Sequence, residues 1–150
     1  MTDTDRAHDI VQILQTQHDQ VRDLLSTIDR ASGSERARPF QELVQQLKAH
    51  EAAEESVVYP VLRTLGSEAA AIADRRVAEE QEAAKVIAEL EKMDPASTQF
   101  TEGFSKFRGA VEKHASSEES EVFPLLSEKL ADDTRLELGS DVLKVEHQHR

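Results

Sequence analysis

The sequence predicts an all-α protein, an antiparallel up-down four-helix bundle with a short additional helix at the C-terminus. Helix-favouring residues are frequent, whereas the 150 residues include only 5 Gly, 4 Pro, 1 Tyr and no Trp. Four long segments also repeat apolar residues every three or four positions, and short turn signals separate them. A chain of this length is expected to form one domain, residues 1–150, with a core from about residue 8 to residue 130.

The charge balance excludes several classes of partner. With 30 acidic and 18 basic residues, the net charge is −12, which leaves no basic surface for nucleic acid or for an anionic membrane. No apolar run is long enough to span a bilayer, and the acidic N-terminus does not resemble a signal peptide. The chain has no cysteine, so disulfides and thiolate metal sites are excluded. We therefore expect a cytoplasmic protein that binds neither nucleic acid nor membrane.

The first helix is expected to begin at Asp3 to Asp5, which offer N-caps, and to run to about Arg30. Its apolar stripe contains a gap of seven residues, and His18 fills that gap. His18 is therefore expected to face the core, and residues 31–39 are expected to form a loop. The stripe consists of Val11, Leu14, Val21, Leu25 and Ile28.

The second helix is expected to begin near Pro39, a favourable first-turn residue, and to reach about Leu65. Pro60 should kink it, and Gly66 with Ser67 indicates a stop followed by a new cap. A His–Glu pair lies on its core-facing stripe, which is Phe40, Leu43, Leu47, His50, Glu54, Val57 or Val58, Val61 and Leu65.

The third helix is expected from about Ser67 to Met93, before Asp94-Pro95. Its stripe is Ala73, Val77, Ala84 and Ile87, with Glu80 or Gln81 bridging the gap.

The fourth helix is expected to start near Ser97 or Thr98, and Pro124 occupies the place that Pro60 has in the second helix. A short fifth helix, from Asp133 to about Glu146, is expected to fold back over one end of the bundle. The stripe of the fourth helix again includes a His–Glu pair: Phe100, Phe104, Phe107, Val111, His114, Glu118, Val122 and Leu125.

A repeated motif indicates the chemistry. HEAAEESVVYP begins at His50 and HASSEESEVFP begins at His114, and each places Glu four residues after His on one helical face. A carboxylate that faces a core is costly unless it is paired or bound to a metal. With His18, the two motifs supply three imidazoles and two carboxylates, which predicts a binuclear metal site suited to iron, manganese or zinc. The alternative is a buried salt-bridge network that contains no metal.

These residues resemble the hemerythrin-like HHE cation-binding domain family, whose pattern is a His on helix one, HxxxE on helix two, a His on helix three and HxxxE on helix four. The resemblance extends from about His8 to Leu130. It implies a non-haem centre, most simply two iron ions, with manganese or zinc as alternatives, and no separate catalytic residue. In that centre the imidazoles would be terminal ligands and the carboxylates would bridge or cap the metals; the implied ligands are His18, His50, Glu54, His114 and Glu118.

The resemblance also implies a small ligand such as O₂, H₂O₂ or NO, which the protein would bind or process. The family includes carriers, sensors and enzymes, and the sequence does not choose among them. The alternative function is a metal-depleted or mononuclear helical module for sensing or interaction, without catalysis.

One position departs from the family pattern, because the third helix reads Glu79-Glu80-Gln81 where the family has its histidine. Three outcomes follow: an open metal position, recruitment of Glu80 as an oxygen ligand, or one weak or empty metal position. Taken singly, Gln81 is expected to have no metal contact and Glu80 to face solvent. Glu55 and Glu119, one residue beyond the motif glutamates, are expected to be solvated as well.

Overall fold

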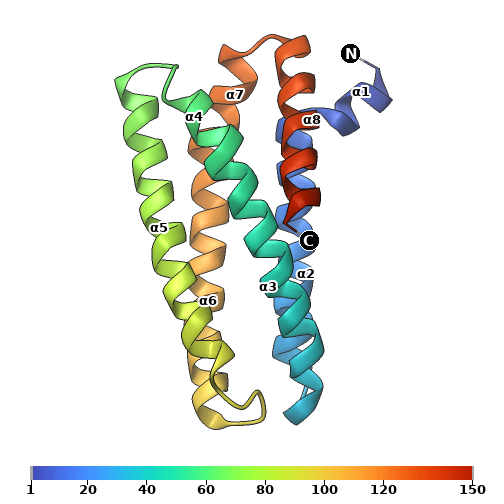
Figure 1. Ribbon diagram of the computed structural model, residues 1–150, viewed down its shortest axis with the longest axis vertical. Helices are drawn as coiled ribbons and strands as arrows, with labels where there is room; N and C mark the ends of the chain where they lie inside the picture. Colours follow the sequence, from blue (N-terminus) through green and yellow to red (C-terminus); the bar gives the residue numbers. More distant parts are fainter. Residues whose placement is uncertain (1, 150) are drawn as a thin grey trace.

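The computed structural model describes residues 2–149, which are almost entirely helical and contain no strand (Figure 1). The long helices alternate in direction, as the sequence predicted. The α-helices are α1 (Asp3–His8), α2 (Ile10–Arg30), α3 (Ala37–Ala53), α4 (Tyr59–Leu62), α5 (Ser67–Glu91), α6 (Thr98–Ser117), α7 (Phe123–Lys129) and α8 (Asp132–Gln148). The remaining helical elements are a 3₁₀ turn (Gly33–Arg36) and two π-helical turns (Glu54–Val58 and Glu118–Val122).

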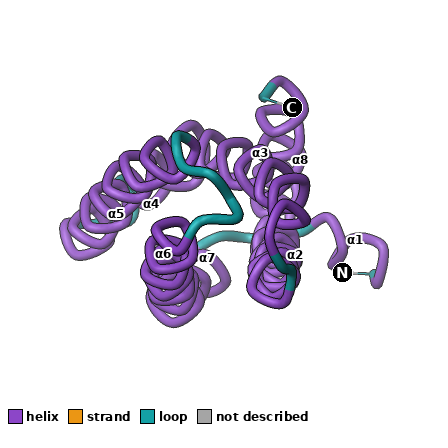
Figure 2. The backbone as a smooth tube through the Cα atoms, turned by 90° about the horizontal axis from the view of Figure 1, so that it is seen from below, coloured by secondary structure: helices purple, strands orange, loops and turns teal. Residues whose placement is uncertain are grey.

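The bundle pairs α2 with α3 and α5 with α6, and the two pairs pack side by side (Figures 1 and 2). The fifth predicted helix is present as α8, but it packs along α2 and α3 and does not cover the end of the bundle. Its inner face buries Val142 and Glu146. The four-helix bundle with an additional C-terminal helix is therefore confirmed.

The first predicted helix is divided in two, which corrects the sequence expectation. Asp9 adopts an extended conformation between α1 and α2, and its carboxylate accepts a hydrogen bond from the Val11 amide at 2.8 Å. The same carboxylate accepts a hydrogen bond from Arg135 of α8 at 2.7 Å. Because Asp9 caps α2 and is fixed by α8, α1 leaves the bundle at this point (Figure 2). The N-cap of α1 is Thr2 and not an aspartate.

Both long helices that carry a His–Glu pair widen into a π-helical turn. In the first, the Tyr59 amide donates to the Glu54 carbonyl, one residue before Pro60, and in the second Phe123 donates to Glu118. Proline has no amide hydrogen and its ring collides with the preceding turn, so a wider turn upstream accommodates it. The kink expected at Pro60 is therefore a π-helical turn that begins at the motif glutamate.

The helix ends agree with the sequence to within a few residues. Ser97 caps α6 by accepting a hydrogen bond from the Phe100 amide at 3.0 Å, as predicted. Helix α3 starts inside the expected loop, and α4 ends at Leu62 instead of Leu65. Ala84 of α5 was expected to face the core, but it is exposed. The C-terminal part of α5 is therefore rotated about its axis relative to the predicted orientation.

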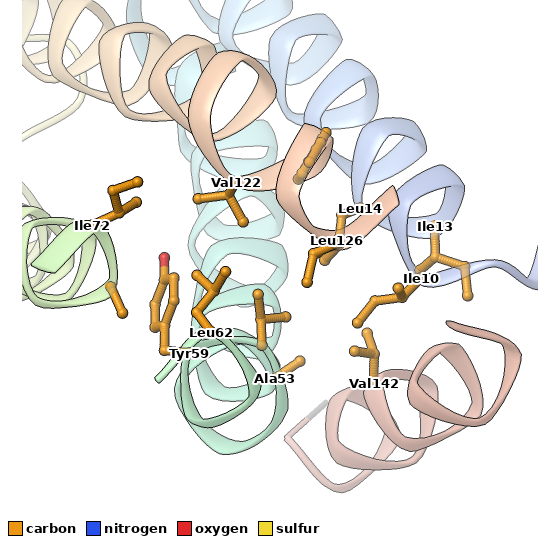
Figure 3. Packing of buried hydrophobic residues seen from close by; sticks show 13 residues of the cluster. Ile10, Ile13, Leu14, Ala53, Tyr59, Leu62, Ile72, Val122, Leu126 and Val142 are labelled. Atoms are coloured by element: carbon orange, nitrogen blue, oxygen red, sulfur yellow. The ribbon is translucent and has the colours of Figure 1, made fainter. Parts of the chain in front are cut away.

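The core consists of two apolar clusters with a polar layer between them. The upper cluster gathers α4, α7, α8 and the upper part of α2, and Figure 3 shows its packing, with the Tyr59 side chain within it. The lower cluster is built around three phenylalanines, Phe100, Phe104 and Phe107, together with leucines of α2 and α3. Burial of this apolar surface stabilises the helices on both sides of the polar layer.

Within residues 2–149, no helix is both long enough and apolar enough to cross a membrane.

Candidate metal centre

The polar layer brings together the side chains of the two repeated motifs and of the first helix. Ligand atoms of His18, His50, Glu54 and Glu118 all lie within 4.8 Å of one another, and all four side chains are buried. His18 Nε2 lies 3.2 Å from a Glu118 oxygen, and His50 Nε2 lies 3.2 Å from a Glu54 oxygen. The i, i+4 spacing explains the second distance, because it aligns both groups on one helical face.

A second group shares Glu54 and adds a residue that the sequence had placed in solvent. Ligand atoms of Glu54, Glu80 and His114 lie within 4.8 Å of one another. His114 Nε2 lies 3.3 Å from Glu80 and 3.5 Å from Glu118. Glu80 is only 2 % exposed, whereas Gln81 points into solvent. The expectation that Glu80 faces solvent was therefore wrong, because its carboxyl group faces the cluster from α5.

Each of the three imidazoles is anchored from outside through its Nδ1. In a neutral imidazole, a donor N–H at Nδ1 leaves the lone pair on Nε2, and in all three residues Nε2 faces the cluster of carboxylates. Outer partners of this kind fix the tautomer and ring orientation of metal-binding histidines. The three hydrogen bonds are His18 to Glu119 at 2.9 Å, His50 to the Gln17 amide oxygen at 2.7 Å and His114 to Glu79 at 2.7 Å.

Glu119 was expected to be solvated surface, and the structure corrects this. Its carboxylate accepts from His18 and from two guanidinium nitrogens of Arg22, at 2.8 and 3.0 Å. Burial alone would raise the pKa of Glu119, but the hydrogen bonds from Arg22 and His18 outweigh it and lower the pKa to about 2. Glu55, the equivalent residue of the other motif, is exposed as predicted.

The other two anchors are also held by a further partner. The buried Arg76 guanidinium lies 2.9 Å from the Glu79 carboxylate, which orients it toward His114. The Gln17 amide nitrogen donates to Glu146 of α8 at 2.7 Å, which fixes the amide oxygen toward His50. Two imidazoles thus face an Arg-supported carboxylate, and the third faces a neutral amide.

Burial and mutual repulsion separate the pKa values within the cluster. Burial and the neighbouring carboxylates raise the pKa of Glu54 well above its usual range, and burial with the Glu54 charge raises that of Glu80 to about 11. Burial also raises the pKa of Glu118, but hydrogen bonds with Glu54 and His18 outweigh burial and lower the pKa of Glu118.

The two histidines shift in opposite directions. Burial lowers the pKa of His50. Burial also lowers the pKa of His114, but Glu80 and Glu118 outweigh it and raise the pKa of His114 to about 9. Without a metal, the cluster therefore retains protons at neutral pH.

Tyr59 is a further residue that sequence spacing did not place at the site. Its hydroxyl lies 3.1 Å from Glu80 and 3.0 Å from Glu118, and the residue is fully buried. A phenol has one proton, so it donates to one carboxylate at a time. Burial, followed by the three nearby carboxylates, raises the pKa of Tyr59 and keeps the phenol neutral. The aromatic residue before each proline was the available signal, but Phe123 at the matching position has no hydroxyl.

Several polar atoms of the cluster lack a hydrogen-bond partner, which argues against the alternative of a salt-bridge network without metal. Among the described residues, five of its buried atoms have no hydrogen-bond partner: His50 Nε2, both Glu54 oxygens, Glu80 Oε1 and His114 Nε2. Unpartnered buried polar atoms are costly, and these five converge on the same space. Imidazole nitrogen with carboxylate oxygen is a donor set for a divalent transition metal, so the residues fit a metal centre.

The comparison with protein families agrees with this arrangement. The model of the hemerythrin HHE cation-binding domain matches residues 9–126, which is most of the chain and includes every residue of both groups. The searches of curated proteins and of solved structures gave no match.

Proposed function

The chain belongs to the hemerythrin HHE cation-binding domain family, and from this premise we propose that it is a single-domain, non-haem di-iron protein. It would bind or process a small ligand such as O₂, H₂O₂ or NO. The cytoplasmic location and the absence of a nucleic-acid partner stay predictions.

The observation that carries the proposal is the common orientation of the three imidazoles. Each donates through Nδ1 to an outer partner and presents Nε2 to buried carboxylates. One ion would be held by the first group, His18 and His50 with Glu54 and Glu118. The other would be held by Glu80 and His114, and Glu54 belongs to both groups. The mixed donors suit iron and also accept manganese or zinc.

The residues of this chain would perform three tasks around the metals. The outer partners hold the imidazoles in one tautomer, so that metal binding requires little reorganisation. The apolar clusters above and below exclude water from the carboxylates. Tyr59 holds a proton at its hydroxyl and donates it in a hydrogen bond to Glu80 or to Glu118, one carboxylate at a time. Iron bound here would supply redox and Lewis-acid chemistry toward the small ligand.

A second candidate, a mononuclear module, is favoured by one specific observation. The group at Glu80 contains a single imidazole, whereas the group at His18 contains two. Imidazole nitrogen suits iron better than carboxylate oxygen does, so the position with one imidazole is expected to bind iron more weakly than the position with two.

Metal content after anaerobic loading with ferrous iron tests the proposal. We expect two irons per chain, with near-ultraviolet absorption after exposure to air, and one iron per chain for His114→Ala. Glu55→Gln is the matched control, because Glu55 is exposed and adjoins Glu54. One iron in the wild type supports the mononuclear candidate, and no retained iron overturns both.

A further inference from the structure

An apolar cavity of about 260 Å³ adjoins the candidate metal centre on the side of the lower cluster. Side chains from α2, α3, α5 and α6 line it, and the cluster residues His18, His50, Glu54, Glu80 and His114 form part of its wall. Its remaining inner wall is largely apolar: Val21, Leu47, Ala83, Val86, Phe107 and Val111. We call this space the apolar pocket.

The pocket is present because small side chains occupy the facing positions of α5 and α6. Ala83 and Val86 project from α5, and Ala110 and Val111 project from α6. Phenylalanines fill the corresponding space one layer below, where Phe100 and Phe104 stack with their ring centroids 5.9 Å apart. A larger side chain in place of Ala83 would fill much of the pocket. The cavity is therefore produced by small side chains and not by the spacing of the helices.

The size exceeds what a diatomic ligand needs. An apolar cavity of about 150 Å³ is large enough to bind benzene, and apolar cavities hold water poorly because they offer it few partners. The pocket is larger than this and is lined mainly by carbon. Its dimensions and lining therefore suit an organic molecule better than O₂ or water alone.

The charges around the pocket select against an anion. Its outer lining includes Glu51, Glu79, Glu82 and Glu112, against Arg22 and Lys113. Arg22 is paired with Glu112 and Glu119, and Arg76 is paired with Glu79, so Glu51 and Glu82 are the acids of the lining that these arginines do not neutralise. The protein as a whole also has a net charge of −12. A neutral ligand avoids both the repulsion and the desolvation of a charge.

We propose that the apolar pocket binds a neutral, mostly apolar organic molecule of about the size of a substituted benzene ring, with an oxygen-bearing end directed at the metal centre. The direction of that end rests on the proposed function: the Glu80 group contributes three protein residues, so a metal there would accept an oxygen donor from outside. The pocket itself does not depend on the metal. The small ligand of the centre would then meet an organic molecule held beside it.

Calorimetric titration with benzyl alcohol tests the inference, using both the metal-free and the iron-loaded protein. We expect saturable binding of one molecule per chain in both forms, and binding of benzoate weaker by at least about tenfold because of its charge. Ala83→Leu should weaken binding of benzyl alcohol by at least about tenfold, since it fills the pocket. Ala84→Leu is the matched control, because Ala84 is the next residue of α5 and is exposed.

Val86→Phe provides a second filled variant if Ala83→Leu does not fold, and circular dichroism monitors folding in every case. Non-saturable uptake by the wild type, or equal affinity in a folded filled variant, would overturn the inference.

Absorption of the iron-loaded protein tests the orientation of the bound molecule. Benzyl alcohol should change the absorption of the centre, and toluene, which lacks the oxygen, should not. An unchanged spectrum with bound alcohol overturns the proposed orientation. Iron binding without alcohol binding leaves the proposed function intact, and alcohol binding without iron binding leaves the pocket intact.

Discussion

The metal-free protein is predicted to lose stability as the pH rises from 7 to 8. In the folded protein the pKa of Glu80 is raised from 4.5 to about 11 and that of His114 from 6.5 to about 9. Because Glu80 is one cause of the raised pKa of His114, the two groups titrate as a pair, and between pH 7 and 8 the folded pair holds a proton that the unfolded chain mostly lacks. The folded state binds more protons, so the free energy of unfolding falls as the pH rises.

The magnitude follows from the number of protons released on unfolding. Each group that differs by a full proton contributes about 1.4 kcal/mol per pH unit. The proton that this pair retains in the folded state lowers the free energy of unfolding by about 1.4 kcal/mol from pH 7 to pH 8. Glu54, with its raised pKa, acts in the same direction. For a domain stabilised by about 5–15 kcal/mol, this loss is readily measured.

Urea denaturation with a chelator present, at fixed pH values from 7 to 8, provides the assay. Glu80→Gln removes one titrating group and should reduce the loss by about 1.4 kcal/mol, whereas Glu55→Gln, at an exposed position, should leave it unchanged. In the metal-loaded protein the ligands are already deprotonated, and metal affinity should increase with pH. A metal-free protein whose stability is constant or rises between pH 7 and 8 would refute the assigned protonation states.

Three further predictions concern single side chains. Glu119→Gln weakens the anchor of His18 and should lower metal affinity about 10- to 100-fold, as measured by competition with a chelator; unchanged affinity would show that the anchor is unimportant. Tyr59→Phe removes the buried hydroxyl and should destabilise the metal-free protein by about 1–3 kcal/mol in urea denaturation, so an unaltered midpoint would contradict the hydrogen bonds described. Gly139→Ala places a methyl group against the His8 carbonyl and should cost about 1–3 kcal/mol, whereas Gly109→Ala, with open space around it, should be neutral or stabilising.

Much of the candidate site could be predicted because helical spacing is a local property. A residue pair at i, i+4 shares a face in any α-helix, so the two His–Glu pairs were expected to face the core, and both do. His18 was predicted in the same way, from its place in the apolar stripe of the first helix. The helical bundle likewise follows from the apolar periodicity and the turn signals.

The choice between Glu80 and Gln81 could not be made from the sequence. Neighbouring residues of a helix lie about 100° apart, so a modest rotation of α5 exchanges the one that faces the core. The apolar pattern of α5 is weak, because alanines occupy several faces of the helix. The packing of α5 against α4 and α6 sets its rotation, and with it the identity of the buried acid.

The sequence by itself determined the helical class, the two repeated motifs and the imidazole and carboxylate types that converge on the core. These depend on spacing along one chain segment, which a helix converts directly into a shared face. Only the tertiary structure decided what lies beside each motif. Glu55 and Glu119 occupy the same position in the two copies, yet Glu55 faces solvent while Glu119 meets His18 and Arg22 of α2. The difference arises because a helix presents the same side chains wherever it is placed, whereas its neighbours are set by the packing of the whole bundle.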